Sequence, residues 1–219
     1  MKILTIDSTL NNLYLSLGNS NGDFFESKTI QSQNNKYHSA YIANGIAELL
    51  KNHALSPEDL DAIGVNIGPG SFTGIRVGMT TSRVLAQAHN LKAVGVPSLE
   101  ILSKYNNSDL PTLVLMDARK NKAYCAIYKE KNLSPCSIDI EEAQKLAKSG
   151  KYFTIIDKNM QKYLDISNKN TLIFEENPKD LGRFLFEITT EKLSTNSDFN
   201  WAKLKPLYIQ PPPITLKKP

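Results

Sequence analysis

A short pattern recurs half-way along this chain of 219 residues. Residues 3–7 read Ile-Leu-Thr-Ile-Asp, and residues 113–117 read Leu-Val-Leu-Met-Asp. Each is an apolar run that ends in aspartate, as a buried strand does where it enters a loop. Seven residues after each aspartate a tyrosine, Tyr14 or Tyr124, opens a second strand-like run. The repeat predicts a duplicated domain, with halves at 1–106 and 107–219 and a C-terminal tail able to pack back on the first half.

Strands and helices alternate within each half. Three strand-like runs open the first half, and we expect helices at 36–53 and 71–90 and strands at 62–67 and 93–96. In the second half we expect helices at 140–148 and 181–188, a strand at 152–156 and a loop at 189–200. This order predicts an α/β fold with two mixed sheets and helices packed on them.

Composition excludes several classes of protein. With 41% hydrophobic and 22% charged residues, wholesale disorder is not expected. Asp7 interrupts any leader-like apolar stretch, and no apolar run approaches the roughly 18 residues that cross a bilayer. The two cysteines form no C-x-x-C pair. These features predict a cytoplasmic protein without a membrane partner.

The densest motif is the string Gly68-Pro-Gly-Ser-Phe-Thr-Gly-Ile-Arg-Val-Gly78. It follows an expected strand and opens an expected helix, where backbone N–H groups can hold an anion. A dinucleotide fingerprint fails because position 73 is threonine, and a Walker A loop fails because no Gly-Lys-Ser/Thr follows. Ser71 is expected to cap the helix, since no His/Asp partner for a nucleophile is evident.

Small residues recur every fourth position along the second helix, at Gly74, Gly78, Ser82 and Ala86. Such a row forms a groove that admits a second helix, and the protein's own sheet or a partner could equally fill it. In the helix expected at 36–53, a core stripe leaves a second face with Tyr37, Tyr41, Ala40, Asn44 and Ala47. Tyrosine is enriched at interfaces, which favours a partner. A Gly74→Leu change is then expected to break a complex and leave the monomer folded.

These residues carry a resemblance to the TsaB (YeaZ) family. The string at 68–78 is highly specific, and supporting segments are Ile6-Asp7-Ser8, His38-Ser39, Gly95-Val96-Pro97-Ser98, Asp117-Ala118-Arg119 and Pro206-Leu207-Tyr208. The resemblance implies the duplicated fold of actin, sugar kinases and heat-shock ATPases. It also implies a role in making N6-threonylcarbamoyladenosine at adenosine-37 of tRNA.

The resemblance further implies a non-catalytic accessory subunit. Such proteins pair with the catalytic TsaD through N-terminal helices, help recruit the ATPase TsaE, and form a homodimer when TsaD is absent. Transfer to tRNA then takes place in the complex, and ATP is used by the partners. The interface expected from the resemblance and the small-residue pattern comprises Tyr37, His38, Ala40, Tyr41, Asn44, Ala47, Gly70, Phe72, Gly74, Arg76, Gly78, Ser82 and Ala86.

An active ATPase of this fold needs glycine-rich phosphate loops, and the second half holds only Gly150 and Gly182. We therefore interpret Asp7, Ser8, Asp117 and Arg119 as positions of degenerate phosphate loops, with no catalytic residue and no metal site. A stand-alone ATPase and a peptidase are the alternatives. Three histidines without ligand spacing argue against a metal peptidase.

The net charge of +4 is mild. Basic residues gather in two clusters of the sequence: Arg119, Lys120, Lys122, Lys129 and Lys131, and then Lys203, Lys205, Lys217 and Lys218. A solvated face explains them, and direct contact with tRNA phosphates is the alternative.

Overall fold

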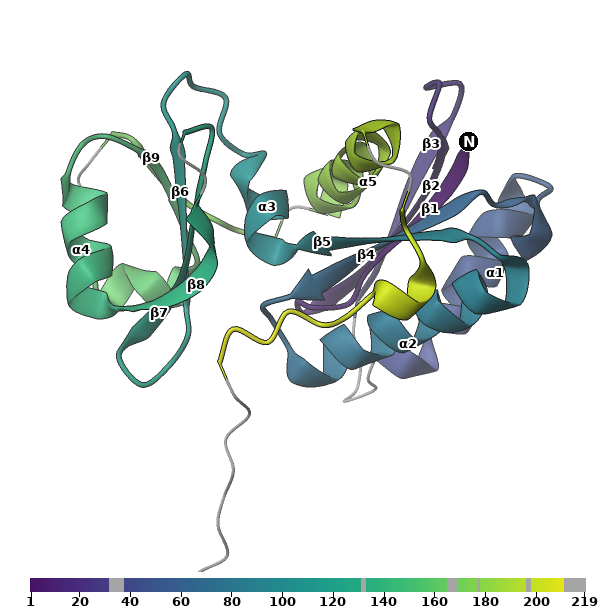
Figure 1. Ribbon diagram of the computed structural model, residues 1–219, viewed down its shortest axis with the longest axis horizontal. Coiled ribbons are helices and arrows are strands. Elements are labelled where there is room, and N and C mark those ends of the chain that lie inside the picture. Colours follow the sequence, from purple (N-terminus) through teal and green to yellow (C-terminus); the bar gives the residue numbers. More distant parts are fainter. Residues whose placement is uncertain (32–37, 131–132, 165–168, 177, 196–197, 211–219) are drawn as a thin grey trace, which may run out of the picture. The chain divides into compact units, whose positions relative to one another are not determined.

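A computed structural model describes residues 1–31, 38–130, 133–164, 169–176, 178–195 and 198–210. The chain forms two compact units (Figure 1). The first comprises Met1–Tyr105 and Glu175–Pro206, and the second comprises Asn106–Phe174 and Leu207–Pro219. The chain first passes from one unit to the other between Tyr105 and Asn106, one residue before the expected boundary. The stretch 175–206, expected in the second half, instead packs with the first.

The first unit is built on a five-stranded sheet in the order β3-β2-β1-β4-β5. β1 pairs antiparallel with β2 and parallel with β4, while β2–β3 is antiparallel and β4–β5 is parallel. The strands are β1 (Lys2–Asp7), β2 (Asn12–Asn19), β3 (Phe25–Gln31), β4 (Ala62–Gly68) and β5 (Lys92–Pro97).

The second unit repeats this plan in a sheet ordered β10-β9-β6-β7-β8. Here β6 pairs antiparallel with β7 and parallel with β9, as β1 does with β2 and β4. The strands are β6 (Thr112–Asp117), β7 (Lys122–Tyr128), β8 (Leu133–Asp139), β9 (Phe153–Ile156) and β10 (Thr171–Ile173). The predicted duplication with two mixed sheets is confirmed. The registers of the β1–β2 and β6–β7 pairs differ by one residue, because Tyr14 lies opposite Asp7 whereas Tyr124 lies opposite Met116.

Helices cover both faces of the first sheet. Figure 1 shows α1 and α2 on one face and α5 on the other. Leu4, Ile6, Ile63 and Val65 of the central strands belong to the core cluster that also includes residues of α1 and α2. The helices are α1 (Ile42–Asn52), α2 (Phe72–His89), α3 (Ser98–Ser103) and α5 (Pro178–Thr195) in the first unit, and α4 (Ile140–Lys148) in the second.

The loop expected at 189–200 is wrong as far as residue 195, because α5 continues to Thr195. The hydroxyl of Thr189 donates to the Leu185 carbonyl at 2.7 Å, and that of Thr190 donates to the Phe186 carbonyl at 3.0 Å. Such back-bonding satisfies a threonine hydroxyl inside a helix, so the polar sequence does not end it.

Small residues let α5 lie close to the sheet. A Cβ on Gly64 of β4 would lie 2.2 Å from Thr189 Oγ1, and one on Gly182 would lie 2.2 Å from Ser27 Oγ. Thr189 is itself fully buried. The α5 face of the sheet is therefore packed through glycine and hydroxyl side chains.

We predict that Gly64→Ala lowers the free energy of unfolding by about 1–3 kcal/mol, because the new methyl group overlaps Thr189. Thr189→Ala removes the two closest atoms, so the double variant should be more stable than the sum of the single changes by about 0.5 kcal/mol or more. Urea denaturation of the three variants measures this. Strict additivity would show that α5 is not seated this closely.

Candidate functional site on the α1–α2 face and the Asp7 loop

The loop after β1 folds back on its own aspartate. Thr9 donates to Asp7 Oδ1 from its backbone N–H at 2.9 Å and from its hydroxyl at 2.7 Å. Asn66 of β4 donates to Asp7 Oδ2 at 2.8 Å. Burial raises the pKa of the Asp7 carboxyl, and the hydrogen bonds from Asn66 and Thr9 oppose that rise. Both carboxylate oxygens thus accept hydrogen bonds from the chain itself.

The start of the glycine string is fastened to the same network. Asn66 Oδ1 accepts hydrogen bonds from the N–H of Gly68 at 2.9 Å and from the hydroxyl of Ser98 at 2.8 Å. The N–H of Ser71 donates to the Thr9 carbonyl at 2.8 Å. A Cβ on Gly70 would lie 2.7 Å from that same carbonyl oxygen, so glycine permits the close approach. The string packs against the loop that follows β1.

The row of small residues on α2 faces the protein's own sheet, which corrects its assignment to a partner surface. Gly74, Gly78, Ser82 and Ala86 are all buried. A Cβ on Gly74 would lie 1.8 Å from the Ser8 carbonyl oxygen, and one on Gly78 would lie 2.7 Å from Ser8 Oγ. Ser8 Oγ donates to the Gly74 carbonyl at 2.7 Å. The small side chains therefore allow α2 to lie directly on the loop after β1.

A second row on α2 is the one that faces outward. Phe72, Arg76, Thr80 and Val84 are exposed, and Phe72 and Val84 keep 45% and 59% of their surface. Each lies two positions from a member of the buried row, which is about 200° around an α-helix. Both rows have a spacing of four residues, so the spacing alone does not tell which row meets the sheet.

The expected α1 surface is retained only in part. Ala40, Asn44 and Ala47 are exposed. Tyr41 is half-buried against the core, because α1 begins at Ile42 and Tyr41 precedes its first turn. Tyr37 lies outside the described residues.

A shallow groove of about 480 Å³ lies between the start of α1 and the exposed row of α2. The guanidinium carbon of Arg76 sits 3.9 Å from the centre of the Phe72 ring at this groove. The lining residues are Ser39, Ile42, Phe72, Thr73, Arg76, Val77, Thr80 and Thr81. We call this surface, with the exposed Ala40, Asn44 and Ala47, the α1–α2 face. Ser39, Thr73, Thr80 and Thr81 were missed, although their spacing from Phe72 and Arg76 places Thr73 and Thr80 on the outer side of the helix.

The loop after β6, which carries Asp117 and Arg119, is also held by interactions within the chain. The N–H of Arg119 donates to Asp117 Oδ1 at 2.9 Å, and Lys162 Nζ lies 3.8 Å from Asp117 Oδ2. The N–H of Asp117 donates to Asp157 Oδ2 at 3.2 Å, and burial raises the pKa of Asp157. Arg119 itself is exposed.

The histidines serve contacts within the first unit. His38 Nε2 lies 3.0 Å from the Leu10 carbonyl oxygen, which ties the 3-10 turn at His38–Ala40 to the loop after β1. His53 Nε2 lies 2.8 Å from Glu26 Oε2, and His89 Nδ1 lies 3.6 Å from Glu58 Oε1. Within the described ranges, no three His, Cys, Asp or Glu side chains gather as a metal site would require. None of the described helices is long and apolar enough to cross a bilayer.

Comparison with known proteins gives a consistent result. The family model described as "TsaD: tRNA N6-adenosine threonylcarbamoyltransferase" matches residues 27–186. A protein of Bacillus subtilis named tRNA threonylcarbamoyladenosine biosynthesis protein TsaB is 33% identical over 134 residues, which is 60% of this chain and 57% of the relative. A protein of the same name from Buchnera aphidicola (subsp. Schizaphis graminum) is 26% identical over 206 residues, covering 84% of this chain and 92% of the relative.

The chain belongs to this family, among its TsaB (YeaZ) members. The solved structure "YeaZ from Pseudomonas aeruginosa" has the same fold, with a TM-score of 0.70 at 16% identity over 94% of this chain and 99% of that one. The alignments with the first curated relatives span only about half of their length, 57% for the B. subtilis TsaB and 42% for a Mycobacterium bovis protein. In this TsaB-family chain the Gly68–Gly78 string has a packing role, since its glycines seat α2 on the loop after β1.

We predict that Gly74→Ala destabilises the monomer by about 1–3 kcal/mol or more, because its methyl group meets a backbone carbonyl that cannot rotate away. This replaces the expectation that a larger residue at 74 spares the fold. Thr73→Ala at the neighbouring exposed position is the matched control. Equal denaturation midpoints for the two variants would contradict the packing described here.

Proposed function

We propose that this chain is a non-catalytic accessory subunit in the synthesis of N6-threonylcarbamoyladenosine at adenosine-37 of tRNA. Its membership of the TsaB family supports this role, as do the names of its relatives in B. subtilis and Buchnera. It pairs with a TsaD-like catalytic subunit and recruits a TsaE-like ATPase, and tRNA is bound by the complex.

The α1–α2 face carries the proposal. An aromatic side chain, Phe72, stands 45% exposed beside a groove between two helices. Ala40 and Ala47 are exposed beside the groove, and their short side chains leave room for a partner helix to approach closely. Exposed aromatic and arginine side chains are the usual anchors of protein interfaces. We assign this face to TsaD, and to a second copy of the chain when TsaD is absent.

The Asp7 loop supports an accessory role over a stand-alone ATPase. In an ATPase of this fold the aspartate after the first strand must face a bound cation and phosphate. Here Thr9 and Asn66 occupy its two oxygens, and it is 1% exposed. ATP is then consumed by the partner subunits, and this chain needs no cofactor of its own.

Reconstitution tests the proposal. Purified TsaD-like and TsaE-like proteins, tRNA, ATP and a threonylcarbamoyl donor should yield modified tRNA only when this chain is added. The isolated chain should not hydrolyse ATP. Full product formation without it would contradict the accessory role, and hydrolysis by the chain alone would favour the stand-alone ATPase.

The assigned surface has its own test. Thr80→Arg fills the groove with a long charged side chain and should weaken binding to the TsaD-like subunit about tenfold or more, or about 1.4 kcal/mol. Ser194→Arg on α5, on the opposite face of the sheet, is the control and should bind as the unmodified chain does. Titration calorimetry measures both. Equal affinities would place the interface elsewhere.

A further inference from the structure

Basic charge is concentrated in the second unit. By sequence, the second unit holds 13 lysine and arginine residues against 8 acidic ones, whereas the first holds 13 against 14. The net charge of the chain is therefore unevenly divided: about +5 in the second unit and about −1 in the first. Such asymmetry is typical of a chain that meets a polyanion on one side.

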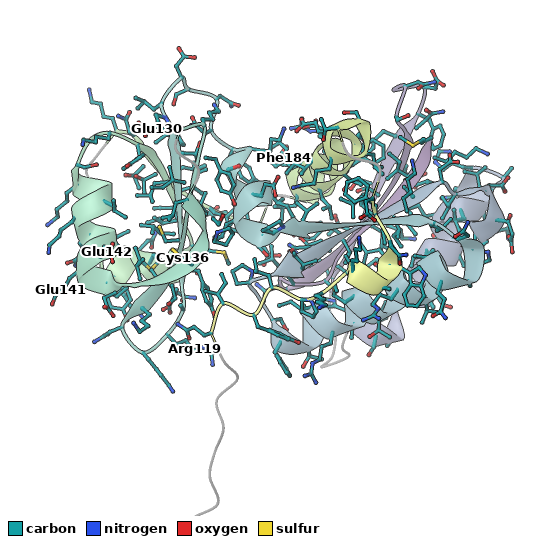
Figure 2. The ribbon with its side chains drawn as sticks, viewed as in Figure 1. Arg119, Glu130, Cys136, Glu141, Glu142 and Phe184 are labelled. Atoms are coloured by element: carbon teal, nitrogen blue, oxygen red, sulfur yellow. The ribbon has the colours of Figure 1, made fainter. Side chains whose placement is uncertain are left out.

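The two ends of the second sheet differ in charge. Arg119, Lys120 and Lys122 lie at the end where β6 finishes, and Lys129 follows β7 at the other end. The basic residues at 119–129 are therefore divided between two sites, and Figure 2 shows the labelled Arg119 and Glu130 at opposite ends of the unit. At the Arg119 end, two lysines are paired with carboxylates: Lys122 with Asp139 at 2.9 Å and Lys162 with Asp117 at 3.8 Å.

Five exposed lysines converge on the other end of the sheet. Lys151 precedes β9 and Lys169 precedes β10, where parallel pairing brings the starts of the two strands together. Lys129 follows β7, which pairs antiparallel with β6 and so ends where β6 begins. Lys145 and Lys148 lie in the last turn of α4, just before β9. We call these five residues the lysine edge: Lys129, Lys145, Lys148, Lys151 and Lys169.

The lysine edge carries charge that the described part of the chain does not neutralise. None of its five ammonium groups has a carboxylate within 4.0 Å among the described residues. Lys129 Nζ donates to the Ser108 carbonyl at 2.9 Å, which positions the side chain without removing its charge. In sequence, Glu130 adjoins Lys129, Asp109 adjoins its partner Ser108, and Asp165 precedes Lys169 by four positions. Glu141 and Glu142 lie in the first turn of α4, at the other end of that helix from Lys145 and Lys148, so the five lysines outnumber the acidic residues beside them.

A contribution to the stability of the fold explains only two of the five lysines. Lys145 and Lys148 complement the dipole at the end of α4, but Lys129, Lys151 and Lys169 lie at strand ends, where no such effect operates. In the order β10-β9-β6-β7 these three span three strand spacings, or roughly 14 Å. A row of separate cations of this length matches several successive phosphates of a nucleic-acid backbone. A membrane surface fits less well, because Leu133 is the only large exposed hydrophobic side chain near this edge among the residues that the structure describes.

We propose that the lysine edge binds the phosphate backbone of RNA, and that it gives the second unit a direct contact with the tRNA substrate. The identity of the RNA rests on the function proposed above, and the contact with phosphates rests on the lysines themselves. The contact is electrostatic and independent of base sequence, so it orients the tRNA without selecting it.

The test is tRNA binding by the full chain over a salt series. Lys151→Glu/Lys169→Glu lies outside any helix, so it should leave the thermal melting point unchanged. It should weaken tRNA binding about tenfold or more at low salt and reduce the slope of log K against log salt by about 2. Lys92→Glu/Lys205→Glu reverses two exposed lysines of the first unit and is the matched control. It should bind tRNA as the unmodified chain does.

Three outcomes would overturn the inference: no difference between the two double variants, no salt dependence, or binding to phosphatidylserine vesicles and not to tRNA. Reconstituted modification separates this failure from that of the proposed function. If the unmodified chain supports product formation and Lys151→Glu/Lys169→Glu does so with the same KM for tRNA, only the lysine edge is wrong. If the unmodified chain supports no product, the accessory role fails, whatever the binding series gives.

Discussion

The contact between α2 and the loop after β1 determines most of what this molecule presents to others. At Gly74 the helix meets the Ser8 carbonyl so closely that no side chain fits. This contact turns the small residues of α2 inward and its opposite row outward. It also holds Ser8 and Thr9 against Asp7, so that a position suited to a phosphate loop is filled by the protein's own hydrogen bonds. One packing constraint thus shapes both the partner face and the Asp7 loop.

Much of the architecture could be predicted from hydrophobic runs and the repeat. The apolar residues at 3–7 and 113–117 became the central strands β1 and β6, and Ser71 became the cap of α2. The missed elements lacked such runs. β8 reads Leu-Ser-Pro-Cys-Ser-Ile-Asp and β10 is three residues long, and both are edge strands, where one-sided pairing tolerates polar residues and proline.

The site was harder to predict than the fold. Periodicity shows which residues share one face of a helix, but it does not show whether that face contacts the protein's own sheet or a partner. Gly74 and Gly78 were as suitable for a partner as for the sheet, and only the position of Ser8 decided between them. Tyr41 was misplaced for a related reason: α1 begins at Ile42, six residues after the predicted start, so Tyr41 does not lie on the helix face. The lysine edge could not be found in sequence, since only strand pairing brings Lys129, Lys151 and Lys169 to one edge of the sheet.

The path of the chain between the two units has a consequence for synthesis. α5 closes one face of the first sheet and Leu204 enters its core, yet both are encoded after the entire second sheet. While the ribosome is still adding residues 106–174, the first sheet has one face bare, with Gly64 and Ser16 awaiting α5. The sheet of the second unit is contiguous in sequence, so it is able to form completely during translation before the first unit does, although it comes second in the chain.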